Sequence, residues 1–184
     1  SGTMALVDVN ASTGAMDFDA PGNITITADG GITASGAGNI DINTTTGYIR
    51  SSATSNGTVD IATAGGTLTL EAQDGIADSA GTAGLDIDTG GGNVTLTTDG
   101  TGATLVDYVS TDADSYTLAM TGTSATGAFT FDSLSTGTLT LNAVTTVGNA
   151  LTVSADGNIS LTSVTTTTGA QTISTSSGTM ALVD

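Results

Sequence analysis

The sequence predicts an all-β protein, a right-handed parallel β-helix of about nine rungs with about 20 residues in each rung. Stretches in which Ile, Leu or Val alternate with polar residues recur along the 184-residue chain, and this alternation is the pattern of half-buried β-strands. Each stretch follows Gly and then Asn or Thr, and Gly and Asn favour the tight turns of such a coil. Many successive motifs start 19 to 21 residues apart, which sets the expected length of one rung.

The strand motif is Gly, then Asn or Thr, then an apolar–polar–apolar triplet. It occurs at Gly2–Leu6, Gly22–Ile26, Gly38–Ile42, Gly57–Ile61, Gly66–Leu70, Gly92–Leu96, Gly137–Leu141, Gly157–Leu161 and Gly178–Leu182. A strand this short buries too little apolar surface to be stable alone, so we expect the triplets to stack in columns from rung to rung. The expected inward side chains are Ile24, Ile26, Ile40, Ile42, Val59, Ile61, Leu68, Leu70, Ile87, Val94, Leu96, Leu139, Leu141, Ile159 and Leu161.

The first and last eight residues of the chain are identical. Both read SGTMALVD, at 1–8 and at 177–184, which gives an offset of 176 residues (177 − 1). Such a repeat indicates a tandem array. We therefore expect residues 1–184 to form a single β-helical repeat module, one period of 176 residues followed at 177–184 by the start of the next copy.

The motif is interrupted between Gly92 and Gly137. This interval of 45 residues (137 − 92) contains the acidic stretch Asp107–Asp114 and four of the six aromatic residues. We expect residues 107–133 to leave the rungs as an irregular excursion.

The charge balance excludes two classes of partner. The chain has 18 acidic residues and one cation, Arg50, for a formal charge of −17. Nucleic acid and anionic lipid both require basic surface, so neither is an expected partner. No apolar run approaches the length that membrane insertion requires.

Catalysis is not expected. Paired carboxylates are the minimum for glycoside hydrolysis, and Asp41, Asp60, Asp86 and Asp88 are predicted at outward strand positions where they could pair across rungs. The chain has no His, no Trp and no Cys, so histidine-dependent nucleophilic triads are impossible. The acidic residues are better explained as a solvated face, and we expect a protein that is not an enzyme and needs no cofactor.

Calcium is the one metal for which the sequence offers candidate ligands, because hard cations bind pairs of carboxylates. The candidate ligands occur in three Asp-x-Asp pairs: Asp17 and Asp19, Asp86 and Asp88, and Asp112 and Asp114. Diffuse screening of the charge is the interpretation that we favour, and we expect no specific metal site; calcium binding by these pairs is the alternative.

Five asparagines, Asn23, Asn43, Asn56, Asn93 and Asn158, begin N-x-Ser/Thr triplets. Glycosylation is one interpretation, and a hydrogen-bonded ladder of Asn side chains along the helix is the one that we favour.

Two segments, Gly22–Ile42 (GNITITADGGITASGAGNIDI) and Gly148–Ser163 (GNALTVSADGNISLTS), resemble the filamentous-haemagglutinin type of repeat of very large secreted adhesins. The resemblance covers most of the chain and excludes 107–133. It implies a right-handed β-helical shaft, export to the bacterial cell surface, and a role in adhesion or contact between cells. It supplies no catalytic residues.

The sequence therefore suggests two alternative functions, one structural and one in binding. The first is structural: a rigid acidic module of a large extracellular fibre or adhesin that stacks end to end with identical copies. The alternative is a binding module for surface glycans or host molecules, presented on the 107–133 excursion.

Overall fold

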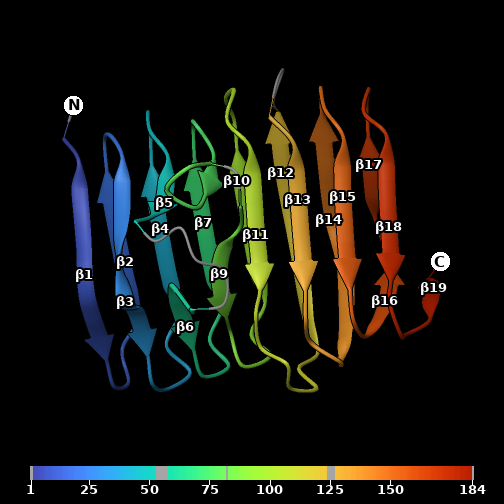
Figure 1. Cartoon of the computed structure of the whole chain (residues 1–184), viewed down its shortest axis with the longest axis horizontal. Helices are drawn as coiled ribbons and strands as arrows, with labels where there is room; N and C mark the ends of the chain where they lie inside the picture. Colours follow the sequence, from blue (N-terminus) through green and yellow to red (C-terminus); the bar gives the residue numbers. More distant parts are fainter. Residues whose placement is uncertain (1, 53–57, 82, 124–126, 184) are drawn as a thin grey trace.

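The computed structural model describes residues 2–52, 58–81, 83–123 and 127–183. In this part of the chain every regular element is a β-strand, and the strands stand side by side from β1 (Met4–Ala11) at one end to β18 (Gln171–Thr175) and β19 (Met180–Leu182) at the other (Figure 1). All pairs between strands are parallel, and the chain forms a β-helix, which confirms the predicted fold class.

The strands form two sheets, between which the chain passes alternately. Sheet A contains β1, β3 (Ile24–Ala34), β5 (Ile49–Ser51), β6 (Ile61–Thr63), β8 (Ile76–Ala77), β9 (Leu85–Asp88), β11 (Thr104–Tyr108), β13 (Phe129–Ser133), β15 (Leu151–Ala155) and β18. Sheet B contains β2 (Met16–Ala20), β4 (Ile40–Thr44), β7 (Leu68–Ala72), β10 (Val94–Thr98), β12 (Tyr116–Thr123), β14 (Thr138–Val147), β16 (Asn158–Leu161), β17 (Val164–Thr166) and β19.

The prediction of about nine rungs was wrong, because the coil has about seven turns. Turns near the ends have the expected length, since Met4 pairs with Ile24 and Ile159 with Met180. The middle turns are longer: Ile40 pairs with Leu68, 28 residues on (68 − 40). In sheet A, β5 and β6 both pair with β3 and form one layer, and β8 and β9 pair with them to form the next, so each of these turns contains two short strands of sheet A.

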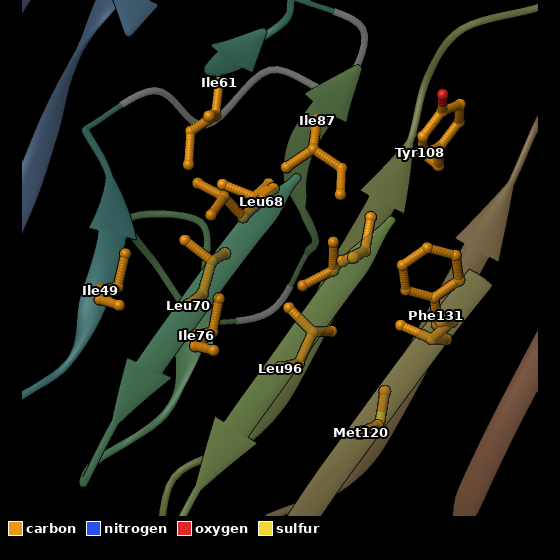
Figure 2. Packing of buried hydrophobic residues seen from close by; sticks show 14 of the residues in the cluster. Ile49, Ile61, Leu68, Leu70, Ile76, Ile87, Leu96, Tyr108, Met120 and Phe131 are labelled. Atoms are coloured by element: carbon orange, nitrogen blue, oxygen red, sulfur yellow. The ribbon is translucent and has the colours of Figure 1, made fainter. Parts of the chain in front are cut away.

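The core lies between the sheets and consists of stacked columns. Thirteen of the fifteen predicted inward side chains are at most 2% exposed. Figure 2 shows Leu70 and Leu96 from sheet B among Ile49 and Ile76 from sheet A. The exceptions are Val59 and Leu161, which are only half-buried.

Residues 107–133 differ from the prediction. They contain the end of β11, all of β12 and all of β13, which pair in register with their neighbours, apart from one register shift between β12 and β14. The aromatic side chains that suggested an excursion instead fill the core: Tyr108 and Tyr116 stack with ring centroids 4.1 Å apart, and Phe131 packs against Tyr116 at 6.3 Å. Residues 124–126 of this segment lie outside the described residues.

Candidate functional site

An acidic column runs along the outer side of sheet A. It consists of Asp60, Asp86, Asp107 and Asp132. In a parallel sheet, residues in register lie directly above one another. Asp107 is in register with both Asp86 and Asp132, and the main-chain N–H of Asp60 donates to the carbonyl of Asp86 at 2.8 Å. The β-helix therefore places four carboxylates on four successive turns.

The two aspartates at one end of the acidic column are buried, contrary to the prediction that both point into solvent. Asp60 is 6% exposed and Asp86 2%. The carboxylate of Asp60 accepts hydrogen bonds from Ser51 Oγ at 2.5 Å and from the Asp86 N–H at 3.1 Å. Asp60 is therefore shielded from water. These two hydrogen bonds satisfy its carboxylate in place of the water that we expected at an outward position.

Asp107 occupies the middle of the acidic column and is half-buried. A Cβ on Gly84 would lie 2.3 Å from the Asp107 carboxyl carbon, so only glycine leaves room for this side chain. Burial, followed by repulsion from Asp86 and Asp132, raises the pKa of Asp107 to about 6. Burial is also the main cause of a raised pKa at Asp60.

A shallow depression of about 400 Å³ lies beside the acidic column. Its lining residues are Ala83, Gly84, Leu105, Asp107, Thr130, Asp132 and Ser154. Neighbouring carboxylates with one raised pKa can share a proton, and a carboxyl group with a raised pKa can also serve as the acid in glycoside hydrolysis. The lining nevertheless provides no aromatic side chain to stack on a sugar and no cation to bind an acidic one. The lining of this depression therefore lacks the groups with which sugar-cleaving clefts usually bind their substrates.

The three predicted calcium pairs lie in different places. Asp17 and Asp19 are exposed on β2 in sheet B. The pKa of Asp41 is raised mainly by its partial burial, and repulsion from Asp17 and Asp19 adds to this effect. Asp86 and Asp88 lie on β9, and the Asp88 carboxylate accepts the Gly90 N–H at 2.9 Å. Asp112 and Asp114 lie in the connection after β11, where Asp114 accepts the Tyr108 hydroxyl at 3.1 Å. Among the described residues, no three carboxylates come close enough to form a metal site.

The asparagines before strands bind the backbone of the next turn rather than one another. The side-chain oxygen of Asn93 accepts the Thr117 N–H at 3.0 Å, and that of Asn158 accepts the Thr179 N–H at 2.9 Å. Asn39, which begins no N-x-Ser/Thr triplet, accepts the Thr67 N–H in the same way. The order Asn-then-strand was the signal for these turn contacts. Asn56 lies outside the described residues.

Both ends of the shaft present strand edges. β18 and β19 end their sheets on one side, and β1 and β2 border them on the other. Apolar side chains that sheets normally bury are exposed at the C-terminal edge: Met180 is 45% exposed and Leu182 78%. We call β18 and β19 the C-terminal edge and β1 and β2 the N-terminal edge. Exposed strand edges of this kind bind further strands.

Comparison with known proteins yields no relative: no protein-family model, no curated protein and no solved structure matches the chain. Within the described residues, no helix is long and apolar enough to cross a membrane.

Proposed function

We propose that this chain is a structural repeat module of a large extracellular fibre or adhesin, and that its copies stack end to end into an acidic β-helical shaft. The observation that carries the proposal is that each end of the helix is a strand edge and that the same octapeptide occurs at both ends. A strand edge with exposed apolar side chains is stabilised by pairing with the edge of another copy.

The lateral surface supports the same role. It carries most of a charge of −17, which repels neighbouring shafts and leaves axial stacking as the favoured contact. Much of the described part of residues 107–133 lies in β11, β12 and β13, so it is not the separate excursion on which the glycan-binding alternative depended. We also propose that the chain lies outside the cell. If so, antibodies against it should label intact cells of the source organism.

The experiment is to measure self-association of the chain in 0.5 M NaCl, where the charge is screened, by analytical ultracentrifugation and electron microscopy. We expect unbranched particles whose length grows with protein concentration. Leu182→Asp places a charge on the C-terminal edge and should weaken association at least tenfold. Leu134→Asp is the matched control, because Leu134 is exposed on the side of the shaft, after β13.

Equal association of the two variants would contradict axial stacking. Globular particles of fixed size, formed by the unmodified chain, would contradict it as well.

A further inference from the structure

The two copies of the octapeptide lie in different sheets. In β1 the segment Met4–Leu6 belongs to sheet A and pairs with Ile24–Ile26 of β3. In β19 the identical segment Met180–Leu182 belongs to sheet B and pairs with Ile159–Leu161 of β16. A period of 176 residues therefore does not equal a whole number of turns: it spans seven turns, from β1 to β18, and then the passage to the other sheet.

The two environments of the octapeptide are complementary. β1 lies one turn before the motif Gly22–Ile26, and β19 lies one turn after the motif Gly157–Leu161, which begins with the same Gly-Asn-Ile. The Met4 N–H donates to the Asn23 carbonyl at 2.8 Å, and the Ile159 N–H donates to the Thr179 carbonyl at 2.9 Å. One strand can therefore make both sets of bonds, with the end of one copy below it and the start of the next above it.

Two further ladders continue across such a junction. With a period of 176, Met16 of the next copy occupies position 192 and follows Gln171 by 21 residues, the offset between Ile159 and Met180. β2 of the next copy then covers β18 with its alternation in phase: Phe18 lies above Ile173, and Asp19 above Ser174. The same offset of 21 places Val9 above Val164 on β17.

The turns agree with this register. Thr168-Gly169-Ala170 and Thr13-Gly14-Ala15 are identical tripeptides, and the same offset stacks one on the other. Glycines in stacked turns face the carbonyl of the turn before: a Cβ on Gly38 would lie 2.2 Å from the Gly14 oxygen, and one on Gly178 would lie 2.2 Å from the Gly157 oxygen. Gly14 lies in the first turn and has nothing within 4 Å of its Cβ position, which leaves room there for the carbonyl of a preceding copy.

We propose that consecutive copies are rotated about the shaft axis so that sheet B of one copy continues as sheet A of the next. This inference rests on the proposed function, because it describes the junction of a continuous shaft. The acidic column then changes sides from copy to copy rather than forming one line of charge. At about 4.8 Å per turn, each copy adds about 35 Å to the shaft.

The test uses a two-copy protein, residues 1–176 followed by 1–184, with paired cysteines in a chain that has none. Ser174→Cys in the first copy and Asp19→Cys in the second should form a disulfide under mild oxidation, because register neighbours have Cα atoms about 4.8 Å apart. Ser160→Cys in the first copy with Asp17→Cys in the second should not, because the proposed junction puts them in different sheets. Thr130→Cys with Thr152→Cys, neighbours within one copy, is the positive control.

The outcomes separate the two proposals. Linkage of the Ser174 and Asp19 positions supports the exchange of sheets. Linkage of only the Ser160 and Asp17 positions overturns it and leaves a continuous shaft. If the control links and neither junction pair does, the continuous shaft itself is wrong.

A second variant tests the same junction without oxidation. Gly14→Ala in the second copy should lower the unfolding midpoint of the two-copy protein by several degrees, because its Cβ meets the carbonyl of the Gly169 turn. In the single chain the same substitution should leave the midpoint unchanged, since no atom lies near that Cβ. Equal effects in both proteins would contradict the proposed register.

Discussion

Asp107 binds its proton more tightly in the folded protein than in the unfolded chain. Its pKa is about 6 in the fold, against an ordinary value of 3.8, because it is partly buried and lies between Asp86 and Asp132, with Asp78 also near. A raised carboxyl pKa stabilises the fold fully below the unfolded value, and this contribution is lost as the pH rises through the folded value. The stabilisation from Asp107 is therefore present near pH 4 and gone above about pH 6.

Asp107→Asn should stabilise the protein at pH 7 and have little effect at pH 4. The amide removes the repelled charge and keeps an oxygen that can accept the Gly84 N–H. We expect a gain on the order of 1 kcal/mol, below the full value of the pKa shift because water screens a half-buried group. Urea unfolding at both pH values measures it.

Asp74→Asn is the control, because Asp74 is exposed. An equal gain from both variants at pH 7 would assign the effect to net charge rather than to the acidic column.

The burial of Asp60 and Asp86 was beyond sequence analysis. The alternation of apolar and polar residues correctly predicted that Ile61 and Ile87 point inward. The adjacent Asp60 and Asp86 must then point to the outer face of the strand. An outward position on a strand is exposed only if nothing covers it. The connection after β8 lies over this part of sheet A: Asp78 is close enough to Asp60 and Asp107 to raise the pKa of both, and Gly84 contacts Asp107. No periodic pattern reveals where a connection folds back.

Glycines at the start of strands let one turn approach the next. A Cβ on Gly66 would lie 2.1 Å from the Gly38 oxygen, and one on Gly92 would lie 1.9 Å from the Gly66 oxygen. These contacts involve backbone, which cannot rotate away as a side chain can. The glycine of the strand motif is therefore fixed by the spacing between turns as well as by turn geometry.

Gly66→Ala should destabilise the protein by about 2 kcal/mol, because the added methyl group forces adjacent turns apart. Gly14→Ala in the single chain is the matched control, since its Cβ position is open. Thermal unfolding followed by circular dichroism compares the two. Similar midpoints would show that turns tolerate side chains and that the motif glycines serve another purpose.

The motif predicted the strands better than the turns. Triplets such as Leu68–Leu70 and Val94–Leu96 stack as expected, because apolar alternation fixes which face is buried. The number of turns was wrong, because we assumed a uniform length of about 20 residues per rung, whereas the middle turns are longer and β5 and β6 both pair with β3 in a single turn. Hydrogen bonding between turns decides which strands belong to the same turn, and no regular spacing in the sequence reveals this.

The whole molecule carries a charge of −17 with a single cation, so self-repulsion opposes its compact state. We expect NaCl to raise the unfolding midpoint by screening. CaCl₂ at matched ionic strength should raise it by a similar amount, because the described carboxylates form no site with three ligands. Differential scanning fluorimetry across both salt series tests this. Saturation by micromolar calcium would instead identify a specific site.

The direction of the hydrogen bonds determines how the shaft responds to pulling. All ladders between turns run along the axis, so tension applied at the ends opens them one turn at a time. A detached turn of 20 to 28 residues extends to about 70–95 Å, against the 4.8 Å it occupied in the coil. Under tension, the length of the chain should therefore increase in steps, as one turn after another detaches from an end of the coil.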